Sequence, residues 1–205
     1  MKPIYLVITP FFPTVESFRG PYVYDQVRAL ERDGRYHIVV LKPTSWLHKE
    51  DYEYGGVKVY RFTTFDLPTN VWPGWGDSLS YRSLNKCLKR LNIDCNDIAI
   101  VHSHVTALGK FANFIKSKNP KCLTVLQHHG YDVLGVTDGR FAKKEWHKTH
   151  CINYGVNICN KIDLHVGVSQ EILRYLGKYE GIMLRDKYVP VSYTHLRAHE
   201  TGRNL

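Results

Sequence analysis

The segment from Ile4 to Leu41 constrains the fold most, because two apolar runs in it are separated by an amphipathic helical pattern. The runs are Ile4–Ile8 and His37–Leu41. Between them, Gly20-Pro21 opens a pattern with apolar residues three and four positions apart, and Gly34 ends it. The segment therefore predicts a strand, a loop, a helix and a second strand, which together form a βαβ unit.

The start of this helix faces the loop that follows the first strand. A helix start presents unpaired backbone N–H groups and the positive end of a dipole, which suits an anion such as phosphate. Ligands of parallel sheets bind beyond the carboxyl ends of the strands. The unit therefore indicates either a nucleotide or phosphorylated ligand at this edge, or simply an ordinary βαβ start.

The rest of the chain continues the alternation of strands and helices, without internal repeats. Further strands are predicted at 56–62, 97–101, 122–126 and 164–168, with one more expected to start at 188–190, and helices around 77–91, 108–115, 140–162 and 169–176. Asp77 or Ser78 is expected to cap the first of these helices, and Ser169 the last. The predicted fold class is α/β, a Rossmann-like, doubly wound and mainly parallel sheet.

The C-terminal segment 191–205 is not expected to belong to the fold. Its first eleven residues, VSYTHLRAHET, resemble one translated frame of a transposon adapter used to prepare DNA for short-read sequencing. We therefore interpret 191–205 as non-native and 1–190 as one domain. The natural reading frame is expected to continue past Pro190.

Composition narrows the class of protein. The formal net charge of +9 suits nucleic acid, an anionic membrane or phosphorylated substrates, but the basic residues are scattered and form no tight run. The five cysteines form no CxxC pair, which favours reduced thiols in a cytoplasmic protein. No apolar stretch reaches the roughly 20 residues of a membrane span.

Polar residues gather where three predicted strands end, at 13–20, 102–104 and 127–132, and are expected to face one crevice. Of His102 and His104, one is expected to pack inward and the other to reach the crevice. A metal site that adds His128 or His129 is the alternative, but no acidic residue has HExxH-like spacing, and no metal site is predicted.

Several residues near these strand ends could contact a ligand. Gly130 permits a turn that places His129 beside a ligand, and Asp132 either fixes that turn or binds a sugar hydroxyl. Arg19 either meets a phosphate or lies on the surface. Trp72 and Trp75 either stack on an acceptor or fold into a small satellite cluster. The helix within 140–162 carries basic residues near Trp146, so it either contacts an anionic membrane or presents a solvated face.

Motifs of other enzyme classes are missing from the sequence, including GxGxxG, GxxxxGK[ST] and GxSxG. The chain instead resembles the N-terminal domain of a GT-B-fold, family 4-type glycosyltransferase over nearly all of 1–190. The resemblance rests on PFFP at 10–13, Gly20 with YDQVRAL at 24–30 and Gly34, IVHSH at 100–104, HGYD at 129–132 and Val168-Ser169. Arg19-Gly20 replaces the usual Gly-Gly pair of the first loop.

The resemblance implies a function and a role for some of the site residues. It implies transfer of a sugar, with retention, from a nucleotide-diphosphate-sugar to a glycan or lipid-linked acceptor, without a metal or other cofactor. It implies that Gly20 lies close to the donor phosphates, that His129, the predicted catalytic residue, lies near the transferred sugar, and that His104 lies at the acceptor side. The residues themselves add Arg19 and Gly130 as candidate donor-binding residues, and Asp132, Trp72 and Trp75 as candidate acceptor-binding residues.

The resemblance also implies that the donor-binding C-terminal domain is missing and that the fragment is inactive alone. The full enzyme is expected to be cytoplasmic, with peripheral contact at the inner membrane face, and to bind no nucleic acid. Two alternatives remain: a natural single-domain subunit that needs a donor-site partner, and a basic nucleotide- or nucleic-acid-binding Rossmann domain of another class.

Overall fold

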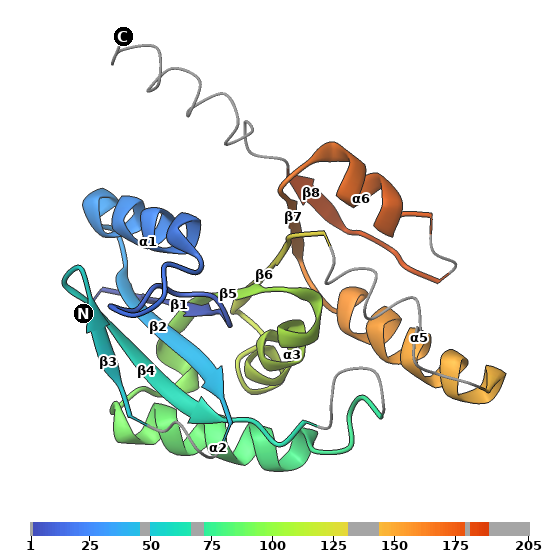
Figure 1. Ribbon diagram of the computed structural model, residues 1–205, viewed down its shortest axis with the longest axis horizontal. Helices are drawn as coiled ribbons and strands as arrows, with labels where there is room; N and C mark the ends of the chain where they lie inside the picture. Colours follow the sequence, from blue (N-terminus) through green and yellow to red (C-terminus); the bar gives the residue numbers. More distant parts are fainter. Residues whose placement is uncertain (1, 46–49, 67–71, 131–143, 179–180, 189–205) are drawn as a thin grey trace, which may run out of the picture.

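The computed structural model describes residues 2–45, 50–66, 72–130, 144–178 and 181–188. Within these ranges the chain forms one sheet of eight strands in the order β3-β4-β2-β1-β5-β6-β7-β8 (Figure 1). The strands are β1 (Ile4–Ile8), β2 (His37–Thr44), β3 (Tyr52–Tyr54), β4 (Val57–Thr63), β5 (Ile98–His104), β6 (Leu123–His128), β7 (Leu164–Gly167) and β8 (Asp186–Tyr188). All neighbouring pairs are parallel except β3 and β4, so the predicted fold class is confirmed.

Helices cover both faces of this sheet. They are α1 (Pro21–Asp33), α2 (Asp77–Arg90), α3 (Gly109–Lys118), α5 (Glu145–Cys159) and α6 (Gln170–Leu176), with short 3-10 turns at Cys95–Asp97 and Thr106–Leu108. Figure 1 shows α1 on one side of the sheet and α2 and α3 on the other. The structure therefore has the layered arrangement of a doubly wound α/β protein.

The core divides between the two faces according to the period of two along β1. Leu6 and Ile8 belong to a large apolar cluster that includes residues of α2, α3, α5 and α6. Val7, between them, belongs to a smaller cluster with Val23 and Val27 of α1. Because alternate residues of a strand point to opposite faces, one strand contributes to both clusters.

The ends of α1 are set by two glycines, as the sequence predicted. Gly20 precedes the helix at φ +82° and Pro21 is its first residue. Gly34 ends it at φ +72°, and its N–H donates to the carbonyl of Leu30 at 3.3 Å. Glycine adopts this left-handed conformation at little cost, which explains why the helix starts and ends where it does.

Two expectations about helix caps have different outcomes. Ser169 caps α6 as predicted, because its hydroxyl accepts the N–H of Ile172 at 3.4 Å. The cap assigned to Asp77 or Ser78 is wrong: Gly76 precedes α2, and no side-chain cap is formed there. Asp77 is the first helical residue, and its carboxylate binds Lys110 instead. Within the described ranges, no helix is long and apolar enough to span a bilayer.

Candidate functional site

The loop between β1 and α1 folds back tightly on Gly20. The Thr9 hydroxyl donates to the carbonyl of Phe11 at 3.0 Å and accepts the N–H of the same residue at 3.1 Å. A Cβ on Gly20 would lie 2.6 Å from the Phe11 carbonyl oxygen and 2.8 Å from the Phe11 Cβ. Gly20 therefore lets the start of α1 approach the loop more closely than any other residue could.

Three histidine rings stack beside this loop, and we call His102, His104 and His129 the histidine ladder. The ring centroids are 4.5 Å apart between His102 and His104, and 5.4 Å apart between His104 and His129. His104 Nδ1 lies 3.2 Å from His129 Nε2, within hydrogen-bond distance. At the inner end of the ladder, the Tyr5 hydroxyl lies 2.9 Å from His102 Nδ1.

The ladder corrects the expectation that only one of His102 and His104 packs inward. Both residues are buried, and their rings stack. The reason is the period of two along a strand, which places residues i and i+2 on the same face. β5 also extends through His104 instead of ending before the histidines, so the strand itself sets their spacing.

Burial keeps the inner part of the ladder uncharged. Desolvation, with a smaller contribution from His129, lowers the pKa of His102 to about 4. Burial and the two neighbouring rings lower the pKa of His104 well below its usual value. Burial also raises the pKa of the Tyr5 hydroxyl. At neutral pH, His104 is therefore a neutral imidazole that can donate or accept one hydrogen bond toward His129.

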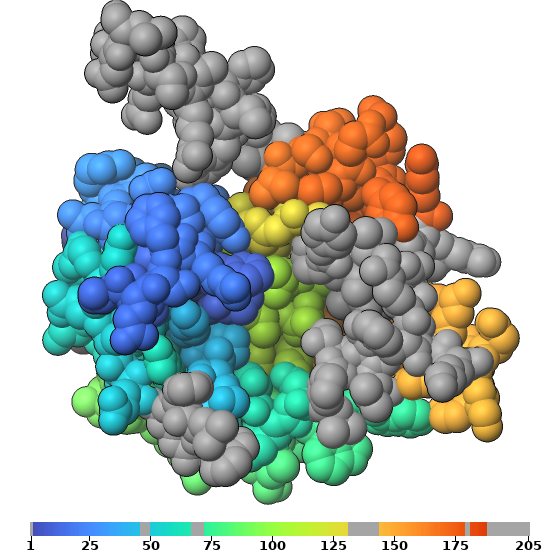
Figure 2. All heavy atoms as spheres, viewed as in Figure 1, coloured from blue at the N-terminus to red at the C-terminus, as the bar shows by residue number. Residues whose placement is uncertain are grey.

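The half-buried ring of His129 reaches the loop and α1. Its centroid lies 5.0 Å from that of Tyr22, on the first turn of α1, and 6.5 Å from that of Phe11. Phe11 also lies against Gly20, so this one residue contacts both the start of α1 and His129. Gly20, His104 and His129 thus converge, as the sequence predicted. Figure 2 shows the neighbourhood, with the blue N-terminal segment beside the yellow end of β6.

The link between β5 and α3 contains a strained residue next to the ladder. Val105 follows His104 and has φ +66°, a conformation that costs a β-branched residue on the order of 1–3 kcal/mol. Its N–H donates to the carbonyl of Gln127 at 2.9 Å, which holds it in place. Strain of this kind is concentrated at functional sites, and here it ends β5 at the point where His104 meets His129.

The remaining residues singled out in the sequence lie in different places. Arg19 is exposed beside Gly20, and Gly130 has φ +118°, which agrees with the predicted turn. Asp132 lies outside the described residues. Trp72 stacks on the rings of His147 and His150 of α5, with centroids 5.4 and 4.7 Å away, as expected for a satellite cluster.

Trp75, in contrast, is 66% exposed. Its backbone N–H donates to the carbonyl of Trp72 at 3.4 Å, so the two tryptophans belong to one short turn. Trp75 is therefore more accessible to a ligand than Trp72, which is 36% exposed and packs against α5.

His128 belongs to a separate buried pair and does not join the ladder. His128 Nε2 lies 3.0 Å from His165 Nδ1, and His165 Nε2 donates to the carbonyl of Cys159 at 3.1 Å. Because a neutral imidazole has one donor and one acceptor, His165 Nδ1 must accept from His128. In the part of the chain that the structure describes, no three His, Cys, Asp or Glu side chains are grouped as a metal site.

Sequence reasoning missed several polar contacts around the ladder. The Gln26 amide of α1 donates to the Gln127 side-chain oxygen at 3.1 Å, and Tyr5 and Tyr22 contact the ladder rings. Gln26 is a half-buried polar residue next to the apolar face of α1. A polar residue next to the apolar face of a predicted helix is the one feature of the sequence that could have indicated the contact of Gln26 with Gln127.

A second polar cluster surrounds Lys110 at the start of α3. Lys110 is 5% exposed, and its ammonium group binds the carboxylates of Asp66 at 2.5 Å and Asp77 at 2.8 Å. The Tyr154 hydroxyl of α5 donates to the other oxygen of Asp77 at 2.8 Å. This network, buried at Lys110 and exposed at Asp66, connects the segment after β4 with α2, α3 and α5.

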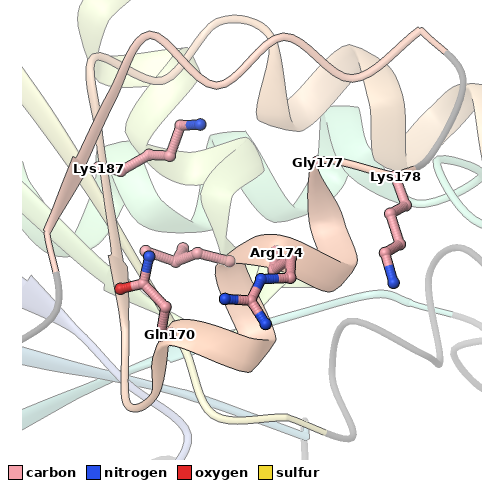
Figure 3. Close-up of a pocket in the computed structure, with 6 residues that line it drawn as sticks. Gln170, Arg174, Gly177, Lys178 and Lys187 are labelled. Atoms are coloured by element: carbon pink, nitrogen blue, oxygen red, sulfur yellow. The ribbon is translucent and has the colours of Figure 1, made fainter.

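A pocket of about 350 Å³ lies apart from the ladder, between α6 and β8 (Figure 3). Its polar lining is one amide, from Gln170, and the cationic groups of Arg174, Lys178 and Lys187. Arg174 is already paired with Glu171 at 2.7 Å. The pocket lacks the convergent loops and stacked rings of the site at Gly20, and we do not assign it a role.

No protein-family model and no curated protein sequence matches this chain. Solved structures do match. A sucrose-phosphate synthase from Thermosynechococcus elongatus is 15% identical with a TM-score of 0.62, covering 98% of this chain and 53% of that one. A shorter chain of the same enzyme is 11% identical with a TM-score of 0.59, covering 98% and 96%.

A third match is an alpha,alpha-trehalose-phosphate synthase (UDP-forming) from Burkholderia xenovorans, in complex with glucose-6-phosphate. It is 13% identical with a TM-score of 0.51, covering 98% of this chain and 53% of that one. This chain therefore spans about half the length of two of these three. The structural neighbours are GT-B glycosyltransferases, and at such low identity the likeness shows a shared fold.

Proposed function

We propose that residues 1–190 are the acceptor-binding half of a GT-B, family 4-type glycosyltransferase, a hexosyltransferase that uses a nucleotide-sugar and retains the anomeric configuration. The observation that carries the proposal is the convergence of Gly20, His104 and His129 around Phe11 at the start of α1. The structural neighbours, which include sucrose-phosphate and trehalose-phosphate synthases, support it at the level of the fold.

The start of α1 is the proposed place of the donor diphosphate. The helix is 13 residues long, so its first turn carries the positive end of a full dipole. Gly20 has no side chain to block the approach, and the exposed Arg19 adds a positive charge beside it. During transfer the leaving diphosphate gains negative charge, which these groups would stabilise more than they stabilise the bound substrate.

His129 is the proposed contact with the transferred sugar. Its ring is held by stacking on His104, by the contact of their nitrogen atoms and by Tyr22. Retaining transfer passes through an oxocarbenium-like state, in which the geometry of the sugar changes while the protein groups stay fixed. A ring that is already oriented by neutral neighbours stabilises this state without reorganisation during the reaction.

The acceptor would enter from the side of His104 and the 72–76 turn. Trp75 offers an exposed aromatic face for a sugar ring or a lipid-linked acceptor. Trp72 would act indirectly, because its stacking on α5 fixes the turn that carries Trp75. Asp132 remains a proposed acceptor ligand.

The proposal predicts that the 205-residue chain transfers no sugar by itself, because the donor-binding half would lie beyond Pro190. Incubation with a panel of nucleotide-sugars and chromatography of the products tests this, and detectable transfer would contradict it. Reading the genomic DNA past Pro190 separates the two forms of the hypothesis. A continuing frame of about one domain supports the truncated enzyme, and a stop codon supports a natural subunit.

In the full-length enzyme, His129→Ala is expected to lower turnover at least 10-fold, while the free energy of unfolding changes much less. This expected loss of turnover is a lower bound, because removing one oriented hydrogen-bond donor from a transition state typically costs about 10²-fold or more. His37→Ala is the matched control, because His37 is an exposed histidine at the start of β2. Unchanged transfer by the His129 variant would remove this residue from the site.

Peripheral contact of the full enzyme with an anionic cytoplasmic membrane face is also part of the proposal. Trp146 is 58% exposed at the start of α5, and the exposed Lys144 and Lys148 flank it. Tryptophan prefers the headgroup region and lysine attracts anionic lipid. Co-sedimentation with vesicles should need anionic lipid and should weaken in Trp146→Ser. Equal binding to neutral vesicles would argue for a plain solvated face.

A further inference from the structure

Two cationic side chains lie side by side on β2 and β4, across β1 from the strand that carries His102 and His104, and we call Lys42 and Arg61 the cationic pair. They are register partners on the parallel strands β2 and β4, so their side chains leave the same face. Both flank the ring of Tyr52 on β3. The Arg61 Cζ lies 4.8 Å from the ring centroid, and the Lys42 Nζ lies 5.5 Å from it.

Among the residues that the structure describes, no carboxylate lies within ion-pair distance of Lys42 or Arg61, so the charge of the cationic pair has no acidic partner there. The nearby Asp51 is engaged elsewhere, because it pairs with Arg90 at 2.8 Å and accepts the backbone N–H of Arg61. Burial, and then the charge of Arg61, lower the pKa of Lys42. An anion between the two side chains would favour the charged form of Lys42 and so offset both the burial and the repulsion by Arg61.

The pair still has hydrogen-bond donors available for an anion. Lys42 Nζ donates to the Phe12 carbonyl at 3.3 Å and to the Tyr52 hydroxyl at 3.4 Å, which uses two of its three N–H groups. Arg61 Nε is buried and has no hydrogen-bond partner among the described residues. A guanidinium group presents a planar fork of donors, which matches the oxygen atoms of a phosphate group.

The cationic pair and the histidine ladder meet on opposite sides of one dipeptide. The Phe12 carbonyl accepts from both Lys42 and the Tyr52 hydroxyl, at 3.3 and 3.2 Å. The ring of the preceding residue, Phe11, contacts His129, and its backbone lies against Gly20. A substrate at the ladder that extended past Phe11-Phe12 would therefore bring a second group toward the cationic pair.

We propose that Lys42 and Arg61 bind the phosphomonoester group of a phosphorylated acceptor. This inference rests on the proposed function, in which the start of α1 is reserved for the diphosphate of the donor. A phosphomonoester carries between one and two negative charges at neutral pH and three acceptor oxygens, which match two adjacent cations. The acceptor class is then a phosphorylated molecule instead of an uncharged glycan.

The test measures binding of inorganic phosphate to the full 205-residue chain by titration calorimetry, at constant ionic strength maintained with chloride. Arg61→Gln is expected to weaken phosphate binding at least 10-fold, because it removes a charged hydrogen-bonding partner. Lys42→Gln should act in the same direction. Arg82→Gln is the matched control, an exposed arginine on α2, and should change binding less than 2-fold.

Two further measurements keep the outcome decisive. Circular dichroism must show that each variant is folded. If Arg61→Gln unfolds, it is replaced by Arg61→Lys, which keeps the positive charge but lacks the planar fork of donors. Arg61→Lys should bind phosphate several-fold more weakly than the wild type. Vesicles that contain phosphatidic acid form a second arm. Displacement of phosphate by these vesicles assigns the phosphomonoester to a lipid, and no displacement assigns it to a soluble molecule.

The inference is overturned if the wild-type chain binds phosphate no more tightly than chloride, or if the Arg61 variant that folds, Arg61→Gln or its replacement Arg61→Lys, binds phosphate as the wild type does. Its failure is distinguishable from failure of the proposed function. Phosphate binding needs no donor domain, whereas sugar transfer by the full-length enzyme depends on His129. Transfer without phosphate binding would leave the proposed function intact, and phosphate binding without transfer would leave only the anion site.

Discussion

Replacement of Gly20 by alanine measures how tightly the candidate site is built, and Gly56→Ala provides the control. The two glycines have nearly the same backbone conformation, with φ +82° and φ +81°. In a left-handed conformation alanine costs about 1–2 kcal/mol relative to glycine, partly offset by a stiffer unfolded chain. That cost should be common to both variants.

The space around the new methyl group differs between the two positions. At Gly56 no atom lies within 4 Å of the position that a Cβ would take, whereas at Gly20 the Phe11 carbonyl oxygen would lie 2.6 Å away. Forcing a methyl group into packed surroundings costs about 1–3 kcal/mol. Gly56→Ala should therefore lose about 1–2 kcal/mol and Gly20→Ala about 2–5 kcal/mol, mostly as displacement of Phe11.

Urea unfolding followed by circular dichroism measures both losses under the same conditions. The difference between the variants isolates the contact with Phe11, because the backbone cost cancels. If the two variants lose the same free energy within about 0.5 kcal/mol, the loop does not press on Gly20 and the site is not shaped in advance. A functional consequence is also expected, since a displaced Phe11 no longer supports His129.

Two other predictions concern buried polar groups. The pKa values of His102 and His165 are lowered to about 4, so below pH 6.5 the unfolded chain binds more protons than the folded protein. The contribution of these two histidines to the free energy of unfolding should be close to its full value above pH 6.5, and it should fall by about 2 kcal/mol per histidine between pH 7 and pH 5. A free energy of unfolding in urea that does not change over this pH range would contradict the buried neutral state. Lys110→Met leaves the half-buried Asp77 and the exposed Asp66 without their cation and should cost about 1–3 kcal/mol, against less than about 0.5 kcal/mol for Lys86→Met on the surface of α2. An equal effect of the two lysine variants in urea unfolding would show that the Lys110 network adds no stability.

The sequence predicted the strands that carry long apolar runs, and missed the short antiparallel strand β3. β3 has three residues, Tyr52–Tyr54, which is too short for a period of two to be recognised. The turn at Gly55-Gly56 pairs it with β4, and without it the position of Tyr52 beside the cationic pair cannot be anticipated. Lys42 likewise becomes notable only when the register of β2 and β4 is known.

The same limit applies to the histidine ladder. Strand order placed His104 and His129 at one edge of the sheet, which follows from the carboxyl-end rule for parallel strands. Their contact depends on the pairing of His104 with Gln127, which no local pattern encodes. The contributions of Tyr5 and Gln26 come from elements far apart in the sequence. Sequence reasoning thus located the edge, and the three-dimensional register determined its chemistry.

The dipeptide Phe11-Phe12 connects folding of the first βαβ unit with the geometry of both proposed binding regions. Phe12 is 1% exposed and packs in the apolar cluster beneath α1, so its position is fixed by the core. Its carbonyl is then available to Lys42 and Tyr52, and the adjacent Phe11 reaches Gly20 and His129. Because a packed core holds this dipeptide, the ladder and the cationic pair have a set separation within this half of the proposed enzyme. A donor-binding domain would therefore meet an acceptor side that is already shaped, which is the condition for interactions that strengthen in the transition state without reorganisation.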